Sequence, residues 1–214
     1  DLAEGVVRRE DLRPKTAPSQ PVVQVGLGRE LAAGRFSAVF VWCHNPVVTL
    51  PDTVAVKRGL SREDLFVVVH EHFLTETAEL ADVVLPATMF VEHADVYRSY
   101  GHRVMQYARR ASKPPEGPKS NVETFAAIAK RLGLPRETWD VTEEGLCEEL
   151  LEASRPRIAD DELEKLRAGE PVKLRPRELV GWGTPSGKIE LWSEAAKAKG
   201  QPPMATYVED DGDG

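Results

Sequence analysis

The sequence predicts an α/β fold organised around a parallel sheet. Three apolar runs, at 36–43, 65–69 and 81–85, show no polar alternation and are rich in valine, which is typical of strands buried on both faces. The stretches that separate these runs, 52–58 and 75–80, have helical character. Strands that alternate with short helices favour parallel pairing through right-handed crossovers. We therefore expect a partial, Rossmann-like three-layer domain followed by a helical and irregular C-terminal segment.

The segment before the first strand predicts an extended lead-in and one helix. Residues 1–20 are polar and contain prolines, so we expect them to be extended. Between residues 22 and 33 the leucines fall on one helical face, with Pro21 suited to the first position and Gly34 to the position just after the end. A further short helix is expected from Asp52, closing at Gly59.

Polar chain and a well-marked helix follow the third strand. Residues 93–112 are rich in turn formers and predict irregular chain or a hairpin, and 113–119 form a linker. Ser120 and Glu123 have the spacing of a capping box, and Gly133 ends the helix that they begin. The predicted apolar face of this helix consists of Val122, Phe125, Ile128, Ala129 and Leu132.

Two more helices are expected after residue 135. Thr142 caps the first, whose apolar face includes Leu146 and Leu150, and Asp160 caps the second, which ends at Gly169.

The last part of the chain, 171–214, is rich in proline and glycine. Residues 184–191 predict a turn that leads into a strand, and the acidic tail at 209–214 is expected to be disordered. The chain thus divides into a lead-in (1–20), an α/β domain (21–135), a helical segment (136–170) and an irregular or β connection (171–214).

Composition excludes several functional classes. The net charge of −7 argues against nucleic-acid binding, which usually needs a basic face. No run approaches the roughly 20 apolar residues that span a bilayer, so we expect no membrane insertion. Two cysteines are too few for a disulfide framework or a cysteine-only metal site. The chain begins with Asp1 and shows no signal peptide, which favours a piece of a longer protein.

Polar side chains follow each predicted strand. His44 and Asn45 come after the first strand, His70 and Glu71 after the second, and His93 after the third. Ligands of open parallel sheets bind outside the carboxyl ends of the strands, so these residues are candidate ligand contacts. The carboxylate of Glu71 suits an N–H pair like that of guanine.

The histidines leave a second interpretation open. His70 and His72, together with His44 or His93, are candidate zinc ligands of a metal-dependent hydrolase. Against this, alternate residues of a strand would both have to face the metal. Cys43 is expected to be a buried structural thiol and Cys147 a core residue.

Five segments, taken in order, resemble the molybdopterin oxidoreductase family, the bis-molybdopterin guanine dinucleotide enzymes that include formate dehydrogenases, nitrate reductases and dimethyl sulfoxide reductase. The stretch TETAELADVVLPAT is the most specific of these matches. The resemblance covers roughly residues 21–208, and the five segments lie at 42–52, 64–93, 97–106, 114–133 and 184–194.

The resemblance implies a late portion of the catalytic subunit, inactive alone. Residues 21–135 would then bind the nucleotide end of a molybdopterin guanine dinucleotide, ahead of a C-terminal barrel. An iron–sulfur cluster and the protein ligand to molybdenum would belong to earlier segments of the subunit. The implied partners are the other domains of the subunit and electron-transfer subunits, and the implied location is cytoplasmic.

The resemblance also implies cofactor contacts. Asn45 matches a contacting position, and His70 with Glu71 matches another, where the family commonly has an aspartate that binds guanine. His93 stands where some members have a contacting lysine, and Asn121 where many have an aspartate. The remaining candidates are His44, Thr49 and Thr75. A third hypothesis keeps the fold but not the cofactor, as a non-catalytic module.

Overall fold

The computed structural model describes residues 22–98, 100–176, 182–204 and 206–207. The predicted lead-in and the acidic tail lie outside these residues. The chain forms two compact units, residues 1–174 and 175–214, and each is described by itself.

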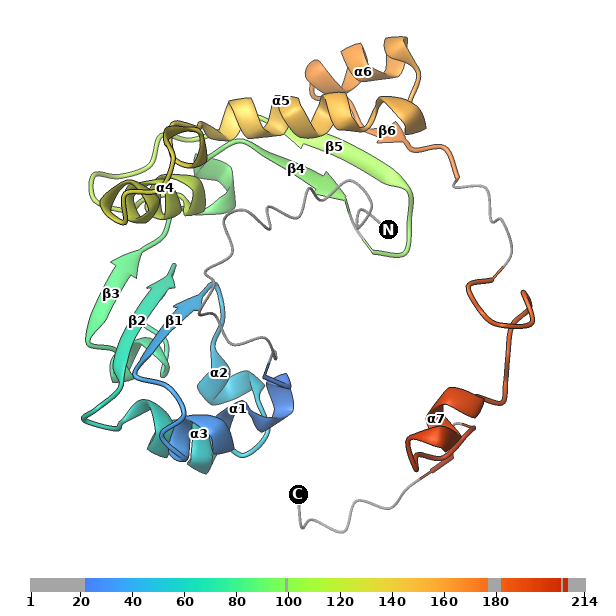
Figure 1. Cartoon of the computed structure of the whole chain (residues 1–214). Helices are drawn as coiled ribbons and strands as arrows, with labels where there is room; N and C mark the ends of the chain where they lie inside the picture. Colours follow the sequence, from blue (N-terminus) through green and yellow to red (C-terminus); the bar gives the residue numbers. More distant parts are fainter. Residues whose placement is uncertain (1–21, 99, 177–181, 205, 208–214) are drawn as a thin grey trace. The chain divides into compact units, whose positions relative to one another are not determined.

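Three parallel strands form the first sheet, as predicted. They are β1 (Ala38–Trp42), β2 (Phe66–Glu71) and β3 (Val83–Pro86), in the order β1-β2-β3. Val41 pairs with Val69, and His70 pairs with Leu85. All three arrows point toward α4, so the three carboxyl ends share one edge of the sheet (Figure 1).

Helices precede and connect these strands. The predicted helix at 22–33 is a short 3₁₀ turn, η3, followed by α1, and Gly34 adopts the left-handed conformation (φ +77°) just after its end. The elements are η3 (Gln24–Gly26), α1 (Leu27–Ala32), α2 (Pro46–Thr49), α3 (Thr53–Leu60) and η4 (Ala78–Leu80). Asp52 caps α3 by accepting from Ala55 N at 3.0 Å.

Gly59 does not end α3 as predicted, and the helix continues to Leu60. A Cβ at Gly59 would lie 2.4 Å from Leu31 Cβ and 2.8 Å from Ala32 N. The glycine is therefore required by the close approach of α1 and α3, which local sequence does not reveal.

The first hydrophobic core lies between α1, α3 and one face of the sheet. Its buried members are Leu31, Val41, Val47, Leu50, Val56, Leu60, Leu65, Val67, Val69 and Ala78. The opposite face is only partly covered, by α4, whose Phe125 ring lies 5.5 Å from Phe40 and 5.1 Å from Trp42 between centroids. Phe66 and Val83 on this face remain exposed, and so does Val84, which is in register with Val69 on the core face. The expectation that all three strands are buried on both faces is therefore wrong, because α4 covers only part of one face and the edge strand β3 is exposed on both.

The predicted helix after the linker is α4 (Asn121–Arg131), and its capping box is present. Ser120 Oγ accepts from Glu123 N at 3.1 Å, and Ser120 N donates to Glu123 Oε2 at 2.8 Å. Its predicted apolar face does not enter a core. Phe125 is 38% and Leu132 70% exposed, and the face lines an open groove of about 730 Å³.

A second sheet follows. β4 (Asp95–Arg98) and β5 (Val104–Ala108) pair antiparallel, which confirms the hairpin, and β6 (Val172–Lys173) pairs antiparallel with β5. The helices α5 (Glu143–Ala153) and α6 (Asp160–Arg167) pack against it. The second core consists of Met105, Leu151, Ile158, Leu163, Leu166, Val172 and Leu174.

The buried face of α5 differs from the prediction. Thr142 caps the helix as expected, accepting from Gly145 N at 3.1 Å. Cys147 is buried, as predicted, and Leu151 is buried with it, whereas the predicted face residues Leu146 and Leu150 are each 38% exposed. Both pairs have helical spacing, so only the position of the second sheet selects between them.

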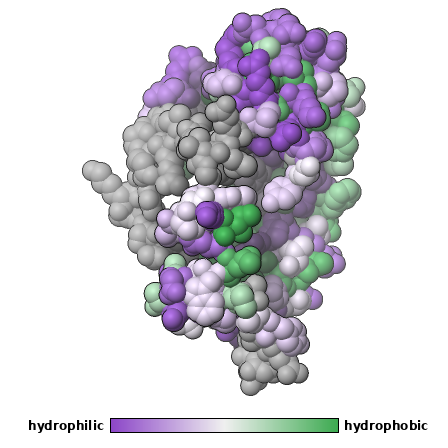
Figure 2. Space-filling model, turned by 90° about the vertical axis from the view of Figure 1, so that its right-hand side faces the viewer, coloured by the Kyte–Doolittle hydropathy of each residue, from purple (hydrophilic) through white to green (hydrophobic). Residues whose placement is uncertain are grey.

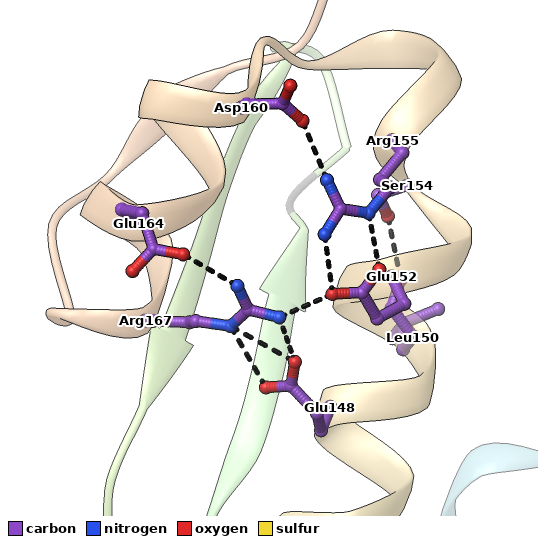
Figure 3. A network of polar contacts seen from close by, with 8 residues as sticks. All are labelled: Glu148, Leu150, Glu152, Ser154, Arg155, Asp160, Glu164 and Arg167. Carbon is purple, nitrogen blue, oxygen red and sulfur yellow. Dashed lines mark hydrogen bonds and ion pairs between the residues drawn. The ribbon is translucent and has the colours of Figure 1, made fainter.

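Charged side chains join α5 to α6 (Figure 3). Arg167 donates to Glu164 Oε1 at 2.7 Å and also pairs with Glu148 and Glu152. These three carboxylates raise the pKa of the Arg167 guanidinium. Arg155 bridges Glu152 and Asp160 in the same network. Asp160 is the first helical residue of α6 and not its cap, a position that Ala159 takes.

In the described residues of the unit at 175–214, the chain forms one short helix, α7 (Glu194–Ala198), which the sequence did not predict. The predicted turn is present, since Gly187 N donates to Thr184 O at 2.9 Å. The predicted strand is wrong, because residues 188–192 form no strand.

Some apolar residues lie on the molecular surface, among polar ones (Figure 2). Within the described ranges, no helix combines the length and apolar character needed to cross a membrane.

Candidate functional site

The chain turns sharply where β1 ends. Cys43 has a left-handed backbone (φ +46°), and its N–H donates to His70 O at 3.0 Å. The thiol is exposed, so the prediction of a buried structural cysteine is wrong. The strand ends at Trp42, and the turn carries Cys43 out of the sheet.

Asn121 reaches this turn from the first position of α4. Its Oδ1 accepts from Trp42 Nε1 at 2.8 Å and from Cys43 Sγ at 3.7 Å. No described residue accepts from Asn121 Nδ2, which is left available to a ligand. Trp42 is 49% exposed, so one part of its indole is open to solvent.

Glu71 also lies near Cys43. Partial burial raises the pKa of the Cys43 thiol, and the nearby Glu71 carboxylate raises that pKa further. The Glu71 side chain is only 11% exposed. Its Oε1 accepts from His72 N at 2.7 Å and from His72 Nδ1 at 3.1 Å. Among the described residues nothing donates to Oε2.

His93 joins this group through Thr88. Thr88 Oγ1 lies 2.9 Å from His93 Nδ1, and Thr88 O accepts from His72 Nε2 at 2.9 Å. Thr88 N donates to Lys119 O at 3.1 Å, which ties the end of β3 to the chain entering α4. Neither Thr88 nor His72 was among the predicted cofactor contacts, although each lies three residues after a predicted strand.

Asn45 forms a neighbouring group with its own partners. Its Nδ2 donates to Glu76 Oε2 at 3.1 Å, and its Oδ1 accepts from Thr77 Oγ1 at 2.6 Å. Thr77 Oγ1 in turn accepts from Val47 N at 3.1 Å. Backbone hydrogen bonding, and next the Asn45 amide, lower the pKa of Glu76. Asn45 therefore holds the start of α2 in place, with one donor and one acceptor of its amide used there.

Three weaker candidates also serve local structure. Thr49 Oγ1 donates to Asn45 O at 2.9 Å and lies 3.4 Å from His44 Nε2. Thr75 Oγ1 accepts from Ala78 N at 3.2 Å, at the start of η4. No hydrogen bond between described residues joins these three to Glu71.

His70 lies beneath the edge and not on it, with its side chain fully buried. Its Nε2 is 3.1 Å from Thr124 Oγ1 and 3.3 Å from Lys119 O. Burial lowers the pKa of His70, and its Nδ1 has no hydrogen-bond partner among the described residues. In this arrangement His70 supports the edge from within by joining β2 to α4.

The four histidines of the zinc hypothesis do not converge. His72 pairs with Glu71, His93 with Thr88, His70 with Thr124, and His44 lies next to Thr49. Nowhere in the described part of the chain do three His, Cys, Asp or Glu side chains form a group able to hold a metal ion. The hydrolase hypothesis therefore has no geometric support in these residues.

The edge has the chemistry of a binding site for a flat, polar ring. It offers a carboxylate oxygen from Glu71, an amide N–H pair from Asn121 and an exposed indole surface from Trp42. Glu71 and Asn121 both lie near Cys43, and a carboxylate together with an amide complements a ring that presents N–H donors next to a carbonyl acceptor.

Comparison with known proteins gives these residues a context. The family model for molybdopterin oxidoreductase matches residues 18–131. Probable oxidoreductase YoaE of Bacillus subtilis is 40% identical over 178 residues, 80% of this chain and 26% of that protein. The assimilatory nitrate reductase catalytic subunit of the same organism is 33% identical over 144 residues, 67% of this chain and 20% of that protein. This chain thus spans about a quarter or less of these relatives.

A solved structure shares the fold. Acetylene hydratase from Pelobacter acetylenicus superposes with a TM-score of 0.68 and 24% sequence identity, over 87% of this chain and 26% of that chain.

Proposed function

The chain belongs to the molybdopterin oxidoreductase family, and we propose that it is part of the catalytic subunit of a molybdenum-dependent oxidoreductase. In this proposal, the shared edge of β1, β2 and β3 binds the nucleotide end of a molybdopterin guanine dinucleotide. The observation that carries it is that Glu71 and Asn121 both lie near Cys43 at the strand edge, each with hydrogen-bonding capacity left over among the described residues.

The spare groups fit guanine. Guanine presents N1–H and an exocyclic amino group next to the O6 carbonyl. Glu71 Oε2 would accept from the two nitrogen donors, and Asn121 Nδ2 would donate to the carbonyl oxygen. The exposed indole of Trp42 offers a surface for stacking. A charge-assisted bond to a mostly buried carboxylate makes Glu71 the principal contact.

The other candidate residues shape and border this site. Asn45 and Thr49 hold the turn into α2, and Thr75 Oγ1 accepts from Ala78 N at the start of η4. His93, held by Thr88, would donate a hydrogen bond at the rim. His70 fixes β2 against α4 from below. The protein's part here is binding and orientation, and the bound cofactor supplies the molybdenum redox chemistry.

The complete protein would contribute what this segment lacks. We propose that other segments supply the molybdenum ligand and any iron–sulfur cluster, so that residues 1–214 are inactive alone. The proposal also includes a cytoplasmic location and contacts with the remaining domains of the subunit and with electron-transfer subunits.

The test is the cofactor content of the purified full-length protein. We expect stoichiometric molybdenum, and one or two equivalents of GMP released by acid hydrolysis. The double substitution Glu71→Gln with Asn121→Ala should lower both contents several-fold, because it removes the base contacts. Glu144→Gln, an exposed acid on α5, is the matched control and should change neither.

Two results would contradict the proposal. A full-length protein without molybdenum or tungsten would favour a non-catalytic module that keeps the fold. Full GMP content in the double variant would mean that this strand edge is not part of the cofactor site.

A further inference from the structure

We propose that His72 is a positioning residue that fixes the carboxylate of Glu71 and so sets the preference of the site for guanine. This inference rests on the proposed function, because it assumes that Glu71 meets the base. It assigns a role to His72 that goes beyond the cofactor contacts named above.

His72 contacts one carboxylate oxygen of Glu71 through two of its nitrogen atoms. Its backbone N–H donates to Glu71 Oε1 at 2.7 Å, and its ring Nδ1 lies 3.1 Å from the same atom. Two donors on one oxygen fix the rotation of the carboxyl group. The second oxygen, Oε2, is thereby given a defined direction while it remains open to a ligand.

The imidazole ring of His72 lies between two acceptors. Nε2 is 2.9 Å from Thr88 O, on the opposite side of the ring from Glu71, and the ring donates to both oxygens when each nitrogen carries a proton. Thr88 is buried, and its N–H donates to Lys119 O at 3.1 Å. The ring therefore spans from the end of β2 to the chain after β3, and it cannot rotate without losing one of these bonds.

A fixed Glu71 carboxylate also makes the site selective between bases. A carboxylate that is free to rotate can adapt to many polar rings, whereas a fixed oxygen rewards one donor pattern. Guanine differs from hypoxanthine only by the exocyclic amino group. An oxygen aimed at that group prefers guanine by about tenfold, the size expected for one added hydrogen bond to a charged acceptor.

Two substitutions at position 72 separate the two contacts of the ring. In His72→Asn the amide nitrogen stands near the place of Nδ1, so it keeps the bond to Glu71 and loses the bond to Thr88. In His72→Gln the amide nitrogen stands near the place of Nε2, so it keeps Thr88 and loses Glu71. The backbone N–H of residue 72 is the same in both.

The experiment measures the affinity of cofactor-free full-length protein for GDP and for IDP by calorimetry. The unmodified protein should bind GDP about tenfold more tightly than IDP. His72→Gln should bring this ratio close to one, by weakening GDP binding while IDP affinity stays the same. His72→Asn should keep most of the preference.

Several results would overturn the inference. One is a preserved GDP preference in His72→Gln. Another is an equal loss of GDP and IDP affinity, which a purely structural role produces. Loss of the preference in His72→Asn but not in His72→Gln would assign the effect to Thr88. Equal binding of GDP and IDP by the unmodified protein would instead overturn the guanine site itself, and this inference with it.

Discussion

The unit at 1–174 contains two regions, each with its own sheet and core, and only one carries the candidate site. The first region, β1 to β3 with α1 and α3, has parallel strands whose carboxyl ends share one edge. The second, β4 to β6 with α5 and α6, is antiparallel, so neighbouring strands end on opposite sides. Strand direction therefore determines where polar loop residues gather.

The two regions also differ in how their polar groups are satisfied. In the second region Arg155 and Arg167 each pair with surrounding carboxylates and share Glu152 (Figure 3). At the edge of the first region Glu71 and Asn121 keep an oxygen and a nitrogen free of described partners. Spare hydrogen-bonding capacity, more than the presence of charge, distinguishes a site from a structural network.

The largest expected effect is on the core of the second region. Leu166→Ala removes a fully buried side chain and should lower the free energy of unfolding by about 3 kcal/mol. Urea denaturation measures this loss. Leu146→Ala, at a partly exposed leucine of α5, is the control and should cost much less. Equal losses would mean that the second core is not organised as described.

The next effect is on the packing of the first region. Gly59→Ala places a Cβ against Leu31 and the backbone of Ala32, which should cost about 2 kcal/mol through overpacking. Gly26→Ala is the matched control, because a Cβ there meets nothing within 4 Å. A Gly59→Ala variant as stable as the parent protein would contradict the close contact of α1 and α3.

A smaller effect should come from the charge network. Arg167→Gln removes the cation that three carboxylates share, so it should lower Tm modestly at low ionic strength. The difference should shrink in 1 M NaCl, where the screening length falls to about 3 Å. Arg136→Gln, which breaks one exposed pair with Asp140, should have less effect. A loss independent of salt would point to packing and not to charge.

The smallest effect concerns the reactivity of the two thiols. Cys43 is exposed and should react with a maleimide, whereas Cys147 is buried, its pKa raised to about 11 mainly by burial, and should stay protected. Only the thiolate reacts, so the rate at Cys43 should rise with pH.

The same reaction tests whether Glu71 lies beside Cys43. The negative charge of Glu71 raises the pKa of the thiol, so Glu71→Gln should lower that pKa and speed labelling several-fold at pH 7.5. Glu79→Gln serves as the control. An unchanged labelling rate in Glu71→Gln would mean that Glu71 does not lie beside Cys43.

The sequence by itself determined the elements that depend on local patterns. Valine-rich runs predicted the three parallel strands, and the capping residues Ser120 and Thr142 predicted the starts of two helices correctly. These signals lie within a few residues of the structure they specify, so they can be read without knowledge of the fold. The order of strands and helices then placed Glu71 at a strand end.

Only the tertiary structure decided which side chains meet. Asn121 bonds to Trp42, which lies 79 residues earlier, and Lys119 contacts Thr88 after β3. Distant packing likewise selected the buried face of α5, placed His70 beneath the surface and required the glycine at position 59. The physical reason is that each of these contacts joins segments far apart in the chain, where local propensity carries no information about the partner.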